Sequence, residues 1–192
     1  MTTDTTARPM RADARRNREA LLHAAGELFA EKGTDVSLEA IAARAGVGIG
    51  TLYRNFPNRE MLVEAAYRTE VEQLCAAATE LLAGHRADVA LAEWMDRFVT
   101  YTATKRGMSS ALQSISAKSE LRSDVRTQIV RAIGELLAAG AVDGTLRSDI
   151  DAADVQRAMG AIWNVGDGPE WRAQAETIIR LLVDGLRHGA RQ

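Results

Sequence analysis

The stretch AGVGIGTLYRNFPNRE, residues 45–60, combines closely spaced glycines with polar side chains that can bind phosphate. Gly48 and Gly50 stand two positions apart, and a glycine at the start of a helix lets the backbone approach a phosphate closely. Two kinds of chemistry fit this pattern. The stretch could form a loop that holds the phosphate of a nucleotide cofactor, or it could open a short helix that lies against DNA.

The residues before this stretch favour the second interpretation, because they predict helix and not strand. A nucleotide-binding glycine loop needs a buried strand in front of it, and Gly-Val-Gly-Ile-Gly completes neither fingerprint of that kind. Ser37 instead predicts the N-cap of a helix over 38–44. Gly46 suits the tight turn that follows, and a third helix is expected over about 48–55. Residues 37–56 therefore have the layout of a helix-turn-helix.

The apolar residues of this segment divide its side chains into an inner and an outer set. Those expected to pack between the helices are Ile41, Ala45, Val47, Leu52 and Phe56. Those left to face outwards are Gly48, Gly50, Thr51, Tyr53, Arg54 and Asn55. A tyrosine is costly to expose, and glycines weaken a helix by about 1 kcal/mol each. The outer set therefore favours a binding surface.

The rest of the chain predicts an all-α protein. Its 192 residues contain three prolines and long runs rich in Ala, Leu, Arg and Glu, without alternating β-branched residues. Further helices are expected over 11–32, 58–83, 88–105, 108–117, 121–140, 152–165 and 170–188. We expect a disordered N-terminal arm over 1–10, a three-helix DNA-binding domain over 11–57 and a larger helical domain over 58–192.

Charge and composition narrow the class of protein. The net charge of −2 provides no overall basic signature, so DNA binding must rest on local charge. Five arginines lie within residues 8–18, and this cluster is either a DNA contact or a solvated tail. The single cysteine excludes an intrachain disulfide. The polar N-terminus and the lack of a long apolar run predict a cytoplasmic protein.

The sequence does not predict an enzyme. The three histidines, His23, His85 and His188, lie far apart, and the carboxylates are scattered over helix faces. We expect no catalytic residue, no metal and no cofactor. A non-specific architectural DNA binder would need a basic surface over much of the protein, and the net charge argues against it.

Residues 21–64 resemble the DNA-binding domain of the TetR family of bacterial transcriptional regulators. The segments that carry the resemblance are LLHAAGELFAEKG, VSLEAIAARAGVGIGTLYRNF and PNREMLVEA. The helical remainder has the family's usual length and contains no motif of its own. The resemblance implies an N-terminal helix-turn-helix domain followed by a helical domain for effector binding and dimerisation.

The resemblance also implies a role for each outward residue. Residues 48–56 would form the recognition helix in the major groove. Thr51 would contact a phosphate or a base edge, and Tyr53 would contact a phosphate. Asn55 stands where the family often has histidine and would also contact a phosphate. Arg54 would either read a guanine or contact a phosphate.

Phosphate contacts are implied outside the recognition helix as well. Arg59 matches the family's basic residue at the start of the fourth helix, and Ser37 would both cap its helix and touch the DNA backbone. Arg15, Arg16 and Arg18 would contribute phosphate or minor-groove contacts. Because one such domain makes few contacts, we expect a two-fold dimer on a palindromic operator.

The effector pocket and the dimer interface are implied within 58–192. The effector-binding candidates, which could also be ordinary core, are Trp94, Phe98, Tyr101, Met108, Leu112, Ile115 and Trp163. The dimer candidates, which could also pack within one chain, are Val155, Met159, Ile162, Ile178, Ile179, Leu182, Val183 and Leu186. The expected protein is a homodimeric repressor that a small, largely apolar effector releases from DNA. An activator, or a regulator without a ligand, is the alternative.

Overall fold

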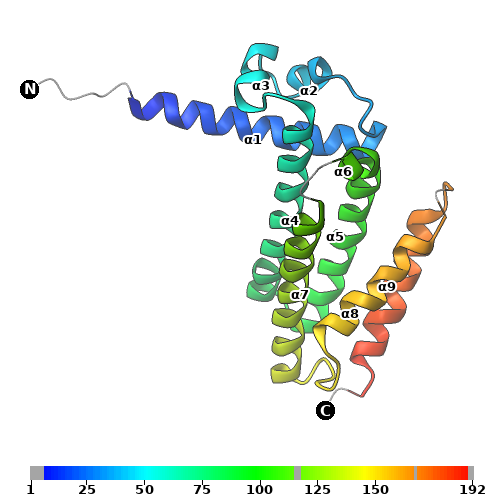
Figure 1. The fold of residues 1–192 in the computed structure, drawn as a ribbon. Coiled ribbons are helices and arrows are strands. Elements are labelled where there is room, and N and C mark those ends of the chain that lie inside the picture. Colours follow the sequence, from blue (N-terminus) through cyan, green and yellow to red (C-terminus); the bar gives the residue numbers. More distant parts are fainter. Residues whose placement is uncertain (1–6, 115–117, 167, 190–192) are drawn as a thin grey trace, which may run out of the picture. The chain divides into compact units, whose positions relative to one another are not determined.

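The computed structural model describes residues 7–114, 118–166 and 168–189, and within these ranges the chain forms nine α-helices and one 3-10 helix, without a strand (Figure 1). The α-helices are α1 (Ala7–Lys32), α2 (Leu38–Arg44), α3 (Ile49–Asn55), α4 (Arg59–Gly84), α5 (Ala87–Gly107), α6 (Ser109–Ser114), α7 (Lys118–Asp143), α8 (Ala152–Met159) and α9 (Trp171–Arg187). The predicted all-α class is confirmed. None of these described helices is long and apolar enough to cross a membrane.

The first helix begins earlier than predicted. α1 starts at Ala7, so residues 7–10 are helical, and residues 1–6 of the predicted arm lie outside the described part of the chain. Pro9 is compatible with this start, because a proline in the first turn of a helix gives up no intrahelical hydrogen bond. The helical part of the N-terminus is therefore longer than the sequence pattern indicated.

The predicted helix over 152–165 is divided in the structure. α8 ends at Met159, and a 3-10 helix, η1 (Gly160–Asn164), follows it. Gly160 stands at the junction, where its weak helix propensity favours the change of winding.

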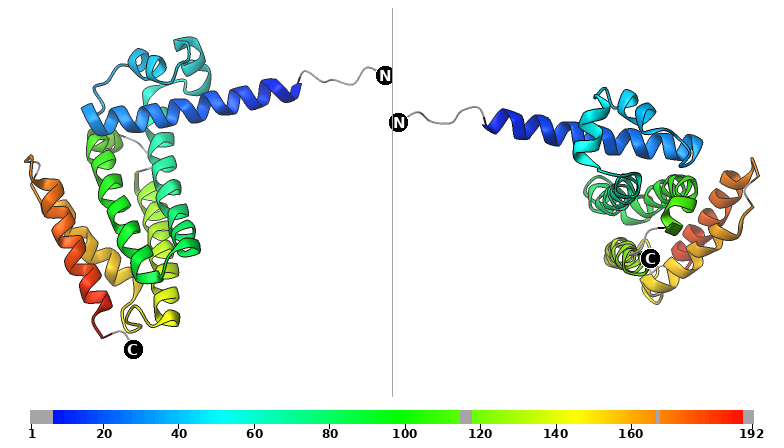
Figure 2. Two further views of the ribbon diagram at one scale, coloured as in Figure 1. Left: turned by 180° about the vertical axis from the view of Figure 1, so that it is seen from behind. Right: turned by 45° about the horizontal axis from the view of Figure 1, so that its top comes forward.

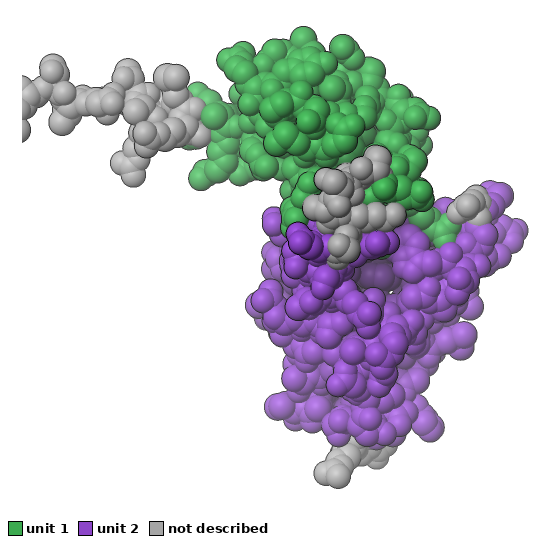
Figure 3. Space-filling model, in the orientation of Figure 1, with its two compact units in different colours: residues 1–70, 103–118 green, residues 71–102, 119–192 purple. Residues whose placement is uncertain are grey.

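The chain forms two compact units, which Figure 3 colours separately. Unit 1 contains residues 1–70 and 103–118, and unit 2 contains residues 71–102 and 119–192. The boundary between residues 57 and 58 stays a prediction, and the two compact units divide the chain at other positions. The first part of α4 and the α5–α6 junction both belong to the N-terminal unit.

Two close approaches to α1 explain why unit 1 is larger than predicted. Gly26 of α1 lies against Glu70 of α4, and a Cβ at Gly26 would lie 2.5 Å from the carboxylate oxygen Oε1. Gly107, the last residue of α5, lies against the α1 backbone, and a Cβ there would lie 1.9 Å from the Phe29 carbonyl oxygen. Both close approaches are possible only because glycine has no side chain. The hydrophobic pattern of the sequence does not show where such approaches occur.

The helix-turn-helix of unit 1 rests on α1. α2 and α3 contact each other, and both contact α1 (Figure 2). The turn between α2 and α3 contains Gly46 at φ +69°, a conformation that favours glycine. The apolar side chains buried in this part of unit 1 include Leu21, Ala25, Phe29, Ile41, Leu52 and Phe56.

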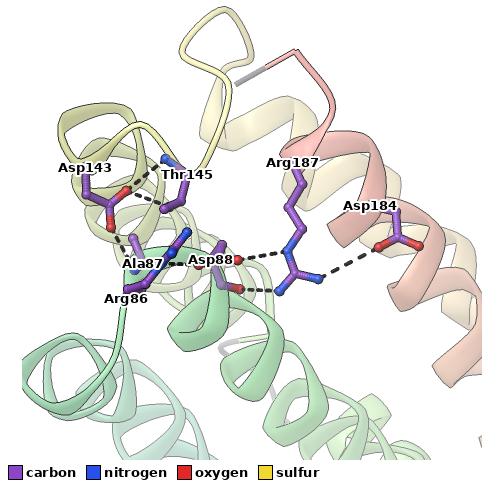
Figure 4. Close-up of polar contacts among 7 residues, drawn as sticks. All are labelled: Arg86, Ala87, Asp88, Asp143, Thr145, Asp184 and Arg187. Atoms are coloured by element: carbon purple, nitrogen blue, oxygen red, sulfur yellow. Dashed lines mark hydrogen bonds and ion pairs between the residues drawn. The ribbon is translucent and has the colours of Figure 1, made fainter. Parts of the chain in front are cut away.

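Unit 2 contains the second part of α4, most of α5, and α7 to α9. The indole N–H of Trp94 on α5 donates to the Leu74 carbonyl oxygen on α4 over 2.7 Å. α9 contacts both α8 and η1. Arg187 of α9 connects to the start of α5, with Nε 3.2 Å from Asp88 Oδ2 (Figure 4).

The carboxylate of Asp143, at the end of α7, caps the start of α5. It accepts from the Ala87 N–H over 3.1 Å and from the N–H and hydroxyl of Thr145 over 3.0 and 2.6 Å (Figure 4). Desolvation raises the pKa of Asp143, but the hydrogen bonds from Thr145 and Ala87, with the charge of Arg86, outweigh it and lower the pKa below 3.8. The ionised form therefore stabilises this corner of the fold.

Replacing Asp143 by asparagine tests that cap. A lowered folded-state pKa means that the carboxylate stabilises the fold above pH 3.8, and that this contribution is lost as the pH falls below it. The wild-type melting temperature should therefore fall more steeply between about pH 5 and pH 3 than that of Asp143→Asn. Thermal melts across this range measure the difference. Asp124→Asn, on the exposed surface of α7, should keep the wild-type slope, and equal slopes for all three proteins would contradict the cap.

Candidate nucleic-acid interface

The first turn of α3 contains the two glycines, and the fold itself requires neither of them. Gly48 is the N-cap at φ −72° and ψ 149°, a conformation open to any residue. A Cβ at Gly48 would meet no atom within 4 Å, and one at Gly50 would meet only Arg54 Nη2 at 3.9 Å. Since these glycines weaken the helix without relieving any internal crowding, their small size is available to a binding partner.

The buried side of α3 fixes the direction of its outer side. Leu52 is completely buried and Phe56 nearly so, while the guanidinium of Arg18 lies 5.2 Å from the centre of the Phe56 ring. Tyr53 is 47% exposed on the outer side, and Arg54 is exposed beside it. Of the predicted inner set, Ile41, Leu52 and Phe56 are buried and Ala45 and Val47 are half-buried.

Two side chains of the outer face are held by the helix backbone. Arg54 donates from Nε to the Gly50 carbonyl oxygen over 3.0 Å, which leaves its terminal nitrogens available. Asn55 donates from Nδ2 to the Thr51 carbonyl oxygen over 2.8 Å, and both Asn55 and Thr51 are half-buried. The amide of Asn55 is thus partly used within α3, whereas Arg54 can reach a base or a phosphate with its terminal nitrogens.

Ser37 caps α2 as predicted. Its hydroxyl oxygen accepts from the Ala40 N–H over 3.1 Å, and Glu39 occupies the favourable first turn. At the other end of α2, Arg44 pairs with Glu27 and Glu31 of α1 over 3.0 and 3.7 Å. The sequence interpretation did not single out Arg44, because only the packing of α2 on α1 brings these three residues together.

Arg59 lies at the start of α4, as the resemblance implied, and its phosphate contact stays a prediction. Its Nη1 and Nη2 donate to the carbonyl oxygens of Thr34 and Val36 over 2.5 and 2.8 Å, in the loop before Ser37. These contacts occupy one N–H group on each of the two terminal nitrogens, which are the groups that would also donate to a phosphate. In this structure Arg59 holds the loop that leads into α2 and lies half-buried.

Replacing Arg59 by alanine separates the two roles. If Arg59 holds the loop, Arg59→Ala should lower the free energy of unfolding by about 1.5–3 kcal/mol, the net value of a charge-assisted hydrogen bond. The slope of log K for DNA against log[salt] should not change, whereas loss of one phosphate contact would reduce it by about 0.9. Denaturant melts and DNA titrations at several salt concentrations give both quantities. Arg16→Ala is the comparison, and a slope reduced by about one in Arg59→Ala would restore the phosphate role.

Three of the predicted contact residues, Arg15, Arg16 and Arg18, lie on the exposed surface of α1. Arg15 lies 3.6 Å from Glu19, Arg16 pairs with Asp13, and Arg18 lies over Phe56. Exposed ion pairs of this kind contribute only about 0–1 kcal/mol, so a phosphate can replace the carboxylate partners at small cost.

Three of the predicted effector residues lie close together within unit 2, and the effector role of the whole set stays a prediction. Trp94, Phe98 and Tyr101 are buried together in unit 2, with neighbouring ring centres 6.1 and 5.6 Å apart. Trp163 is 37% exposed. Of the other candidates, Met108 and Leu112 belong to unit 1, and Ile115 lies outside the described residues.

Most predicted dimer residues are buried within a single chain. The six with little exposed surface are Val155, Met159, Ile162, Ile179, Val183 and Leu186. Ile178 and Leu182 are half-buried, and Leu181 between them is 69% exposed. Of the predicted dimer residues on α9, Ile178 and Leu182 therefore keep the most exposed surface, and the interface itself stays a prediction.

Two models of known protein families match this chain. Residues 21–66 match the model of bacterial regulatory proteins of the tetR family, and residues 86–188 match the C-terminal domain of SbtR-like transcriptional regulators. The second match alone covers more than half of the chain. The chain belongs to the TetR family. It is a DNA-binding transcriptional regulator of the helix-turn-helix type.

Solved TetR structures share both the fold and much of the sequence. A TetR transcriptional regulator from Streptomyces coelicolor is 45% identical, with a TM-score of 0.82 over 90% of this chain and 99% of that chain. A TetR regulatory protein from Mycobacterium vanbaalenii is 34% identical, with a TM-score of 0.77 over 93% and 99% of the two chains. An HTH-type transcriptional regulator of Staphylococcus aureus is 35% identical over 79 residues, which is 40% of this chain and 41% of that relative. The chain thus spans about two fifths of the length of this curated relative.

Proposed function

We propose that this TetR-family protein is a homodimeric repressor that binds a palindromic operator and leaves it when a small molecule binds. The outer face of α3 carries the proposal: Gly48 and Gly50 leave open space beside the exposed Tyr53 and Arg54. In a regulator of bacterial transcription, this activity would take place in the cytoplasm and would need no catalytic residue.

The proposed contacts divide into positioning and reading. Tyr53 and Thr51 contact phosphates, and the backbone at Gly48 and Gly50 comes close to the DNA because no side chain intervenes. Arg54 reads a guanine with the terminal nitrogens that its bond to the Gly50 carbonyl leaves available. Arg15 and Arg16 add phosphate contacts from α1.

The proposed dimer explains how so small a surface can be specific. One recognition helix offers few base contacts, so two copies must bind neighbouring major grooves about 34–36 Å apart. The exposed Leu181, with the half-buried Ile178 and Leu182, supports self-association through α9, since exposed apolar side chains gain most from a partner.

Selection of random double-stranded DNA on the purified protein tests the proposal. We expect an enriched palindrome with half-sites about one helical turn apart. A motif without two-fold symmetry would contradict the dimer, and the absence of any motif, with or without cell extract, would contradict the repressor. A reporter gene placed behind the selected site then separates repression from activation by the sign of its response.

Replacing Gly50 by alanine should have opposite effects on stability and on DNA binding. The new Cβ meets only Arg54 Nη2 at 3.9 Å, so α3 should gain up to about 1 kcal/mol in stability. The same Cβ would stand between the backbone and the DNA, so affinity should fall at least about tenfold, because 1.4 kcal/mol of lost contact has that effect. Gly134→Ala on α7, where a Cβ lies 3.8 Å from Ala152, should be stabilising without changing DNA affinity. Unchanged DNA binding by Gly50→Ala would contradict the close approach.

A further inference from the structure

A cleft of about 670 Å³ lies between α5 and α9 within unit 2. Its volume is in the range of small-molecule sites. Apolar side chains from both helices form part of its lining, namely Ala92, Val99, Ile179 and Val183. Charged and polar side chains complete it: Asp96, Arg97, Thr100, Arg172, Glu176, Arg180, Asp184 and Arg187.

This cleft uses the other side of α5 from the aromatic cluster. At 100° per residue, Ala92, Asp96 and Val99 point away from the face that carries Trp94 and Phe98. The cleft is therefore a separate site from the predicted effector pocket. On α9, residues 179, 180 and 183 line the cleft, whereas residues 178, 181 and 182 are not part of its lining.

The arginines of the cleft differ in how strongly they are held. Arg187 is fixed, because it lies 3.2 Å from Asp88 Oδ2, donates to the Asp88 carbonyl oxygen and lies 3.9 Å from Asp184 (Figure 4). Arg172 lies 3.8 Å from Glu176, too far for a strong hydrogen bond. Arg187 therefore offsets the charge of Asp184, and Arg172 offsets that of Glu176. These are two of the three carboxylates in the lining.

Arg97 and Arg180 are the cations that remain available. The nearest carboxylate of Arg97 is Glu80, at 3.9 Å and outside the lining. Arg180 donates to the Thr177 hydroxyl over 3.3 Å and makes no ion pair with any described carboxylate. Their guanidinium groups keep N–H donors in the planar arrangement that suits carboxylate, sulfonate or phosphate groups.

The remaining carboxylate limits the charge of the ligand. Asp96 makes no ion pair within the described ranges, so a negative charge is present beside Arg97 and Arg180. This charge repels a polyanion more than a single anionic group. The apolar side chains of the lining meanwhile favour a ligand with an apolar body.

We propose that the cleft between α5 and α9 binds a monoanionic small molecule with an apolar body, whose acidic group is held by Arg180 and Arg97. The assignment of this cleft as the effector site of the repressor rests on the proposed function. As a binding site, it is independent of that function, because every lining residue belongs to unit 2.

Two fluorescent probes of nearly equal shape test the assignment. 1-Anilinonaphthalene-8-sulfonate carries one sulfonate, and N-phenyl-1-naphthylamine is its neutral counterpart. We expect the full-length protein to bind the sulfonate at least about tenfold more tightly, since a charge-assisted hydrogen bond contributes that much or more. Octanoate should displace it by competition. Equal affinity for the neutral probe, or no displacement by octanoate, would overturn the proposal.

Matched substitutions locate the binding. Arg180→Gln should weaken sulfonate binding about tenfold and leave the neutral probe unaffected, and Arg97→Gln should act in the same direction. Arg122→Gln, an exposed arginine of α7 outside the cleft, is the control for the lost charge and should change nothing. Circular dichroism checks that each variant folds. Sulfonate binding that survives both cleft substitutions would overturn the site.

DNA titrations on the same samples separate the cleft from the proposed function. Release of the operator by the sulfonate in the wild type but not in Arg180→Gln supports the cleft as the effector site. Binding that depends on Arg180 without release supports the cleft and overturns its effector role. A palindromic operator bound by a protein that does not bind the sulfonate supports the repressor and overturns the cleft.

Discussion

Replacing Gly107 by alanine is expected to lower the free energy of unfolding by about 3 kcal/mol or more, near the upper end for overpacked sites. A Cβ at this position would lie 1.9 Å from the Phe29 carbonyl oxygen and 2.8 Å from the Phe29 carbonyl carbon. Both are backbone atoms of α1, which cannot turn away as a side chain can. The end of α5 or the last turn of α1 must therefore shift.

Urea denaturation of Gly107→Ala beside the wild type measures this effect. The matched control is Gly84→Ala, because Gly84 is also the last residue of a long helix and its Cβ would meet no atom within 4 Å. That control should stay within about 1 kcal/mol of the wild type. Equal stability of Gly107→Ala and the wild type would show that α5 does not approach α1 as closely as described.

The shift should also affect DNA binding. Gly107 contacts the helix on which α2 and α3 rest, and the hydroxyl groups of Thr34 and Ser110 lie 2.9 Å apart beside it. A displaced end of α1 therefore moves the loop that leads into α2. DNA affinity of Gly107→Ala should fall even at temperatures where the variant remains folded.

Replacing Trp94 by alanine should be comparably destabilising, by about 3–5 kcal/mol. Trp94 is completely buried, its ring lies 6.1 Å from that of Phe98, and its N–H donates to the Leu74 carbonyl oxygen. Trp94→Phe keeps most of the ring but leaves that carbonyl without its donor, so a smaller loss of about 1–3 kcal/mol is expected.

Trp163→Ala is the control, because the indole of Trp163 is 37% exposed and less contact area is lost. Thermal and urea melts of the three variants rank them. This ranking also tests the sequence interpretation of Trp94 as an effector contact. A Trp94→Ala protein of wild-type stability would mean that the ring faces ligand space, and the prediction of a core role would then be wrong.

The sequence alone determined the all-α class, the helix-turn-helix over residues 37–56 and the TetR resemblance. These features depend on local patterns: the 3.6-residue spacing of apolar side chains, Ser37 as a cap and Gly46 in the turn. The outer position of Tyr53 and Arg54 follows from the same spacing once Leu52 and Phe56 are buried. The local spacing of apolar residues sets which side of a helix faces inwards. That side can therefore be predicted from the sequence without knowledge of the fold.

Only the tertiary structure decided which distant residues meet. Gly107 packs against Phe29 within unit 1, and the guanidinium of Arg59 meets the carbonyl oxygens of Thr34 and Val36, which lie more than twenty positions earlier in the chain. An apolar stripe cannot reveal whether its partner is the same chain or a second copy, which is why six predicted dimer residues proved to be buried within one chain. The cleft between α5 and α9 likewise depends on side chains that are about 80 positions apart and adjacent only after packing.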